Sequence, residues 1–382
     1  MKKITLAIFV IFAILIFPLF PSQAQEESVP DQQLFEAKVM RIIDQKEITR
    51  EDGSKSIQQN IKLMGLEGLW QGKEIEYSGI NETGLDVISN NVYHEGDKVI
   101  VLYSPDIDGN ETYYVTDYVR QGYLVWLLVI LFIIVFAVAL WKGIKALISL
   151  FLTFVVIIWF VVPRILAGSN PLFITIIGSL IILAIIIYLT EGWNKKSHLA
   201  VISIVISLIF TGLLAILFTH LARLTGSTQE EIMYLVGAGK GSIDFRGLLL
   251  AGIIIGTLGA IDDGVISQVV TVDELRKANP NLDTSHVYAR AMKVGVAHIG
   301  SMINTLFLAY AGASMPLLLV FTIHKEPFLT FSQIINNEMI ATEVVRAFVG
   351  SIGIALAIPI ATLLAALYLH PKPEHEITQE IE

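Results

Sequence analysis

The chain has 382 residues, of which 54% are apolar, and its mean hydropathy is +0.66. This composition excludes an ordinary soluble globular protein and is typical of a polytopic membrane protein. The formal net charge is −9 and cysteine is absent, so disulfides, thiolate metal sites and cysteine catalysis are excluded.

The first segment has the layout of a signal peptide. Lys2 and Lys3 precede an apolar run, and Ser22 and Ala24 supply the small residues before a cleavage point. We therefore predict a signal peptide at residues 1–24, with an uncleaved membrane anchor as the alternative. Both readings place residues 25–120 outside the cytoplasm.

Residues 25–120 are predicted to form a small extracytoplasmic β-domain. Short alternating or β-branched runs such as DKVIVLYS and TYYVTDYV are separated by turn signals, which indicates a small barrel or sandwich of OB-like size. The domain carries 19 Asp and Glu against 9 Lys and Arg. So acidic a domain argues against nucleic acid as a partner.

Residues 121–370 are predicted to form a membrane domain of about seven helices. Each apolar segment is long enough to cross a bilayer whose core is about 30 Å thick. The segments are 123–140, 144–162, 171–190, 199–219, 247–268, 294–322 and 345–369. The fold class is therefore a membrane all-α bundle with an N-terminal all-β domain. Residues 272–293 are expected to form a helix-break-helix elbow between the fifth and sixth segments.

The charges between these segments favour one orientation. With the β-domain outside, the connections on the inner side hold more Lys and Arg than those on the outer side. The predicted location is the bacterial cell membrane, with several spans, an outer N-terminal domain and a cytoplasmic tail at 371–382.

The fifth segment contains two adjacent carboxylates, Asp262 and Asp263. A charge inside a span is costly and needs a partner, a water path or a function. Gly252, Gly256 and Gly259 share a helix face with Asp263, so we expect close helix packing along that face. Asp262 points about 100° away and is expected to be solvated or to cap the helix near the cytoplasmic boundary.

The sixth segment presents a line of polar side chains. We expect His298 to lie at the depth of Asp263, where a carboxylate beside an imidazole suits a proton relay. The hypothesis is a solute or ion path lined by Asp262, Asp263, His298, Ser301, Asn304 and Thr305. The alternative is that these groups are structural, because Ser, Thr and Asn commonly join transmembrane helices by hydrogen bonds.

The seventh segment repeats the spacing of the fifth. Gly350 and Gly353 are predicted to form a packing stripe, and Glu343 is expected to pair with Arg346 at the outer membrane boundary. The sequence contains no nucleophile elbow, HExxH pair or dinucleotide fingerprint, so no catalytic residue, metal or cofactor is predicted.

Four runs carry a resemblance to a known family. They are Val115–Arg120, Gly168–Pro171, Gly256–Asp263 and Gly300–Leu306. In these runs the chain resembles the YibE/F-like family of bacterial multi-spanning membrane proteins, over roughly residues 35–370. The resemblance implies a permease-like membrane protein and leaves the substrate unassigned.

These observations predict a membrane permease or transport component rather than an enzyme. Its partners would be the lipid bilayer and an unidentified small solute or ion, with proton coupling through Asp263 and His298. The alternative is a receptor or assembly scaffold whose outer β-domain binds an envelope protein. A homo-oligomer is compatible with both hypotheses.

Overall fold

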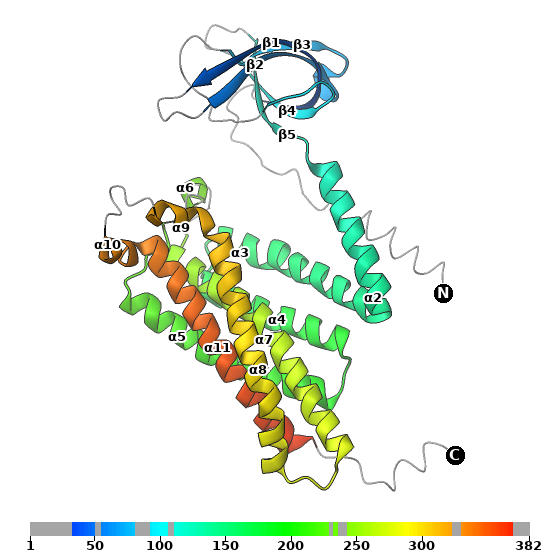
Figure 1. Ribbon diagram of the computed structural model, residues 1–382, viewed down its shortest axis with the longest axis vertical. Coiled ribbons are helices and arrows are strands. Elements are labelled where there is room, and N and C mark those ends of the chain that lie inside the picture. The colour runs from blue at the N-terminus through cyan, green and yellow to red at the C-terminus, as the bar shows by residue number, and fades with distance from the viewer. Residues whose placement is uncertain are drawn as a thin grey trace. The chain divides into compact units, whose positions relative to one another are not determined.

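The structure is a computed structural model that describes residues 33–49, 55–80, 92–105, 111–228, 232–235, 243–322 and 330–369. Two compact units make up the chain, residues 1–131 and residues 132–382 (Figure 1). The predicted signal peptide at 1–24 and the tail at 371–382 lie outside the described residues.

The first unit contains a five-stranded antiparallel sheet with the strand order β3-β2-β1-β4-β5. Register shifts interrupt the pairing of β1 with β2, and such irregularities bend a strand and increase its twist. The all-β N-terminal part predicted from the alternating pattern is therefore confirmed. The strands are β1 (Gln33–Thr49), β2 (Lys55–Gly65), β3 (Glu74–Ser78), β4 (Lys98–Pro105) and β5 (Glu111–Tyr118), with a short 3₁₀ turn, η1 (Gly68–Trp70), after β2.

The core of this sheet comes from one face of the strands. Val39, Ile61 and Val99 are fully buried, as period-two alternation requires for residues on the inner face. Phe35 stacks on Trp70 with a ring-centroid distance of 4.4 Å.

The second unit begins within α2 (Gln121–Val155), which continues through η2 (Val156–Val161) into α3 (Val162–Leu166). These 46 residues form one candidate span by composition, yet at 1.5 Å per residue they are more than twice as long as a bilayer core of about 30 Å. Leu140 has non-helical angles, φ 47° and ψ −129°, and the helix changes direction there (Figure 1). The two arms correspond to the predicted segments 123–140 and 144–162.

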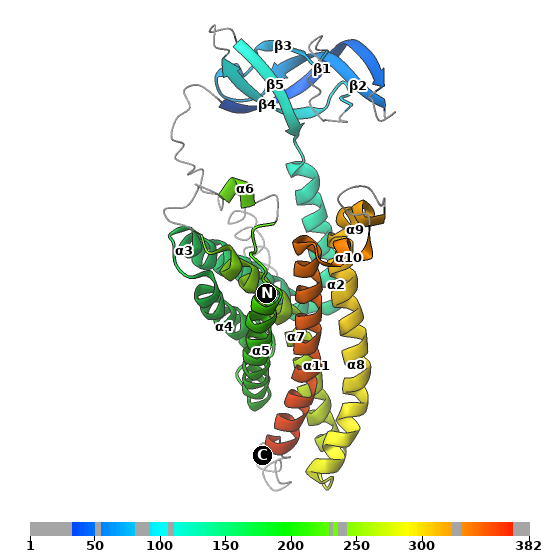
Figure 2. The same ribbon diagram turned by 90° about the vertical axis from the view of Figure 1, so that its left-hand side faces the viewer.

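The remaining long helices form a bundle. Within the described residues, six helical stretches in total, counting α2 to α3 as one, are long and apolar enough to cross a membrane. Figure 2 shows α7, α8 and α11 running side by side. The bundle helices are α4 (Pro171–Thr190), α5 (Lys195–Leu221), α7 (Phe245–Ala278), α8 (Thr284–Ala313) and α11 (Glu338–Tyr368).

Short helices and the elbow join these spans. The elbow between α7 and α8 has the predicted helix-break-helix form, because α7 continues to Ala278 and α8 begins at Thr284. The predicted segment 294–322 is divided at Ser314 into α8 and a short helix. The short helices are α6 (Ile232–Leu235), α9 (Met315–Thr322) and α10 (Phe331–Ile335).

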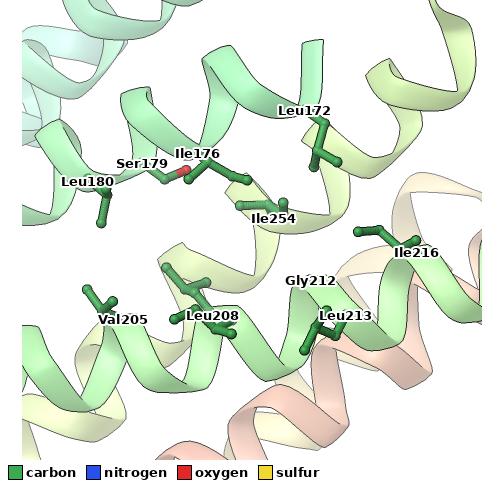
Figure 3. Close-up of a pocket in the computed structure, with 11 residues that line it drawn as sticks. Leu172, Ile176, Ser179, Leu180, Val205, Leu208, Gly212, Leu213, Ile216 and Ile254 are labelled. Atoms are coloured by element: carbon green, nitrogen blue, oxygen red, sulfur yellow. The ribbon is translucent and has the colours of Figure 1, made fainter. Parts of the chain in front are cut away.

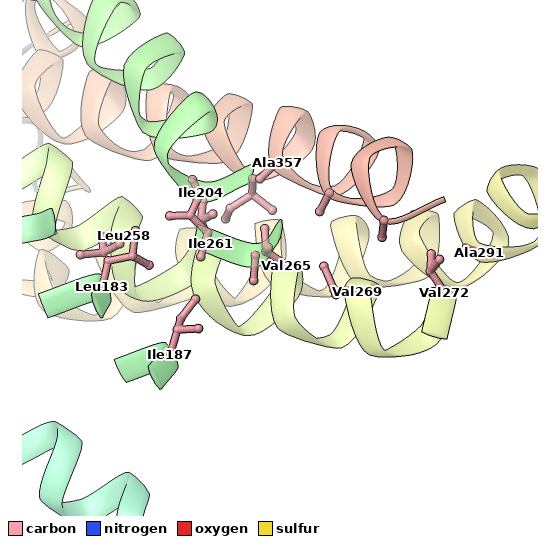
Figure 4. Packing of buried hydrophobic residues seen from close by; sticks show 14 of the residues in the cluster. Leu183, Ile187, Ile204, Leu258, Ile261, Val265, Val269, Val272, Ala291 and Ala357 are labelled. Carbon is pink, nitrogen blue, oxygen red and sulfur yellow. The ribbon is translucent and has the colours of Figure 1, made fainter. Parts of the chain in front are cut away.

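The main apolar core lies where α4, α5, α7, α8 and α11 meet. Leu183, Ile204, Leu258 and Ile261 are all at most 2% exposed and point toward one another from three helices (Figure 4). Val265 continues this core toward the end of α7. The helix α7 thus occupies the middle of the bundle and carries the acidic doublet with it.

Candidate functional site

The two adjacent carboxylates of α7 have different surroundings. Asp262 is 6% exposed, whereas Asp263 is exposed. Asp262, expected at the solvated edge, is instead on the buried face of α7 with Leu258 and Val265, which pack in the apolar core. Its Oδ1 accepts a hydrogen bond from the backbone N–H of Asp263 at 2.9 Å. The pair therefore places one carboxylate inside the bundle and the other on its surface.

The glycines of α7 lie on the more open flank of the helix. Gly252 and Gly259 are exposed, and within the described chain no atom lies within 4 Å of a methyl group built on either one. Gly256 differs, because a methyl group there would lie 2.6 Å from the hydroxyl of Tyr310 in α8. The close packing expected along the whole stripe is thus found in this structure only at Gly256.

The glycines of α11, in contrast, face other helices. A methyl group on Gly350 would lie 2.9 Å from Leu306 Cδ2 of α8 and 3.3 Å from Thr257 Oγ1 of α7. One on Gly353 would meet Thr211 of α5 and would lie 3.1 Å from Thr257 Cγ2. These two glycines allow α5, α7 and α8 to approach α11 closely, as small residues do between membrane helices.

The register of α7 against α8 sets the depth of each polar group. A methyl group on Gly264 would lie 2.7 Å from Met302 Sδ, and one on Gly295 would lie 3.2 Å from Gln268 Nε2. The helices are antiparallel, so these contacts place Asp263 near the level of the stretch from His298 to Met302, which includes Ser301 and ends about one turn before Thr305.

Ser301 and Thr305 share one side of α8, about 40° apart around the helix. Phe307, about 120–160° from them, packs on Phe348 of α11 with ring centroids 5.5 Å apart. Asp263, Ser301 and Thr305 are exposed, and Thr305 Oγ1 donates a hydrogen bond to the carbonyl of Ser301 at 3.0 Å. Asn304 is also exposed, at about 60–100° from these two hydroxyls around the helix.

His298 lies along α8 at a distance from the elbow similar to that of Asp263 along α7. Asp263 is 15 residues from the end of α7 at Ala278, and His298 is 14 residues from the start of α8 at Thr284. No hydrogen bond or ion pair joins the two side chains in the part of the chain that the structure describes. His298 Nδ1 is buried and has no hydrogen-bond partner among the described residues. The expected relay pair therefore lies at a similar level along the two helices, without a direct hydrogen bond between its side chains among the described residues.

Gln268 is a polar residue of this site that was not predicted from the sequence as part of the path. It is fully buried, and its Nε2 donates a hydrogen bond to the carbonyl of Ala291 in α8 at 2.8 Å. Its Oε1 has no hydrogen-bond partner within the described segments. The available signal was a lone amide within the apolar run VISQVV.

A second polar cluster lies between α8 and α11. Arg346 pairs with Glu343, with Nη1 and Oε1 3.0 Å apart, and both side chains are about four-fifths buried. The guanidinium carbon lies 5.8 Å from the ring centroid of Tyr310, the residue that covers Gly256. The cluster therefore connects α7, α8 and α11 near the start of α11.

The described side chains offer carboxylate, hydroxyl, amide and imidazole groups in an apolar setting. No group of three or more His, Asp or Glu suitable for a metal ion occurs in the described ranges. This chemistry can bind or pass a proton, an ion or a small polar solute.

The family model for YibE/F-like protein matches residues 127–371, which is more than half of the chain. The chain belongs to the YibE/F-like family. The match covers α7 and α8 with all the path residues named above, and it confirms the expected family. Three of the four sequence runs lie inside it, and Val115–Arg120 lies before it. The search of curated proteins and the search of solved structures returned no match. Family membership and the apolar helices together support a membrane protein.

Proposed function

We propose that this YibE/F-like protein is a permease or transport component for a small solute or ion, with proton coupling. The observation that carries the proposal is Asp262, a carboxylate that is 6% exposed inside an apolar helix. An ionisable residue within a membrane span is by default a functional-site hypothesis, because its burial is costly.

In this proposal the two carboxylates have separate roles. Asp263 receives the solute or proton on the open flank of α7, together with the hydroxyls of Ser301 and Thr305. Asp262 holds charge or a proton inside the bundle. Gln268 continues the path toward the elbow and His298 lines it from α8, because each has a buried polar atom without a partner among the described residues.

The competing explanation is that these groups are only structural. Buried hydroxyls elsewhere in the bundle favour it, because Ser203, Ser207 and Thr211 are satisfied by donating to the carbonyl four residues earlier in their own helix, α5. Asp262 and Asp263 differ from them, because a carboxylate cannot donate such a bond when ionised.

Proton flux into proteoliposomes tests the proposal. The full chain is reconstituted with a pH-sensitive dye inside, and a potassium diffusion potential drives the flux. We expect Asp262→Asn, Asp263→Asn and His298→Ala to abolish the flux while keeping wild-type expression and thermal stability. Glu274→Gln, an exposed acid at the end of the same helix, is the control and should keep full flux. Full flux in all three path variants would refute the proposal.

We also propose the bacterial cell membrane as the location, with the β-domain outside and the C-terminus in the cytoplasm. The inner connections carry the larger share of Lys and Arg, which supports this orientation. The chain has no cysteine, so single-cysteine variants can report topology without background. In intact cells an impermeant maleimide should label Gln71→Cys in the β-domain and should not label Asn281→Cys in the elbow. The reverse pattern would invert the proposed topology.

A second candidate function is a receptor or assembly scaffold that binds an envelope protein. Leu34 and Leu69 favour it, because they are 64% and 71% exposed on the β-sheet unit. Large exposed apolar side chains can contribute to a protein interface. Deleting residues 25–118 would then abolish function, and a stoichiometric partner would co-purify with the wild type but not with a Leu34→Ser, Leu69→Ser variant. We propose no enzymatic activity for either candidate.

A further inference from the structure

A groove of about 310 Å³ lies between α4 and α5, with Ile254 of α7 among its lining residues (Figure 3). Aliphatic side chains make up most of the lining. The side-chain heteroatom in it, Ser179 Oγ, is itself buried. The groove therefore presents a hydrocarbon surface, and none of the residues of the proposed transport path lines it.

The length of the groove matches one leaflet of a membrane. Its α4 side runs from Leu172 to Leu180, about 12 Å, and its α5 side runs from Val205 to Ile216, about 16 Å. Leu172 is the second residue of α4, so the groove begins at one end of that span. Half of a bilayer core is about 15 Å thick, which is the depth that a lipid chain reaches from its headgroup to the midplane.

The width of the groove decides between possible occupants. Spread over about 15 Å, the volume corresponds to a mean cross-section of about 20 Å². A helix backbone with its side chains is about 10 Å across, so a helix of a second copy cannot enter. A single hydrocarbon chain is narrow enough to enter the groove. An occupant is favoured, because the apolar side chains that line an unfilled volume lose dispersion attraction, and protein interiors are normally close-packed.

We propose that this groove binds one acyl chain of a phospholipid from the leaflet on the side where α4 begins. Gly212 makes room for it, because nothing in the described chain lies within 4 Å of a methyl group built there. The lipid chain would fill the space between α4 and α5, so this site is structural or regulatory and goes beyond the transport path.

Photolabelling of the full-length protein in phosphatidylcholine nanodiscs tests the site. The lipid carries a diazirine midway along one acyl chain, and labelled peptides are identified by mass spectrometry. We expect label to concentrate on 172–180 and 205–216 compared with the exposed apolar residue Leu308 of α8. Gly212→Phe should lower groove labelling about threefold or more by excluding the chain from its contacts.

The matched control is Gly300→Phe in α8, because no described atom lies within 4 Å of a methyl group built on Gly300 either. It should leave groove labelling unchanged. If Gly212→Phe does not fold, Gly212→Leu replaces it with the same expectation. Uniform labelling of all apolar faces, or labelling insensitive to the Gly212 variants, would overturn the proposal. So would a disulfide dimer through Leu213→Cys that protects the groove from label, because it would identify a second copy as the occupant.

Discussion

Arg276, near the end of α7, donates a hydrogen bond from Nη2 to the backbone carbonyl of Ala366 in the last turn of α11, over 2.8 Å. The same guanidinium donates to the carbonyl of Leu282 in the elbow at 2.5 Å and to Thr284 Oγ1 at the start of α8 at 3.2 Å. Arg276 is only 5% exposed. One side chain therefore joins α7, the elbow, α8 and α11 at the elbow end of the bundle.

Arg276→Met should destabilise the bundle strongly. The substitution leaves the buried carbonyl of Ala366 without its donor, and we expect the free energy of unfolding to fall by about 3 kcal/mol. Arg276→Lys should be intermediate, because an ammonium cannot reproduce the planar fork of donors. Unfolding of the purified protein in mixed detergent measures both variants. Lys277→Met, at the exposed neighbour, should change stability little, and an equal loss in the two methionine variants would contradict the assignment.

Substituting alanine for glycine should affect the stability of the protein in opposite ways in α11 and in α7. Gly353→Ala places a methyl group against Thr211 and Thr257, which are at most 1% exposed and cannot move freely. We expect a loss of about 1–3 kcal/mol in unfolding free energy from this overpacking. Gly259→Ala places its methyl group where no described atom lies within 4 Å, and it replaces a residue of low helix propensity. The free energy of unfolding should therefore stay the same or rise by up to about 1 kcal/mol. The same detergent unfolding assay compares them, and equal effects would show that local packing does not decide the outcome.

The sequence predicted the elements well, because both the apolar spans and the alternating strands depend on local patterns. Helical geometry also fixed the angle between Asp262 and Asp263 at about 100°. It could not say which of the two would be buried, since that depends on how α4, α5 and α8 surround α7. The same limit applies to Asp263 and His298. Both helices extend ten residues past the predicted span ends, to Ala278 and Thr284, so the two levels stay similar, but side-chain contact depends on packing that the sequence does not give.

Asp283 should make stability depend on acid pH. Its carboxylate caps α8 and interacts with the ring of His286, and the hydrogen bond from His286 is the main cause that holds the pKa of Asp283 below its ordinary value. A lowered folded-state pKa stabilises the fold above the unfolded pKa, and the contribution disappears as the pH falls through the folded pKa. Asp283→Asn keeps an N-cap oxygen but no charge.

The difference in melting temperature between wild type and Asp283→Asn should therefore be largest near neutral pH. It should shrink as the pH falls below about 4, where the wild-type carboxyl also becomes protonated. Thermal unfolding of the full chain across this range gives the measurement. A difference that grows toward acid pH would reverse the assigned sign.

Gln59 should hold the neighbouring loop of the β-sheet unit in place. Its side chain is 4% exposed, its Nε2 donates to the carbonyl of Tyr93 at 3.0 Å, and its Oε1 accepts from the Tyr93 N–H at 2.7 Å. Gln59→Leu removes both of these buried hydrogen bonds, so we expect about 2 kcal/mol of local destabilisation. Hydrogen–deuterium exchange of the full-length protein should then speed up around residues 92–97 and in β2. Gln71→Leu, an exposed position, should leave exchange unchanged, and unaltered exchange in the Gln59 variant would show that packing of Tyr93 alone holds the loop.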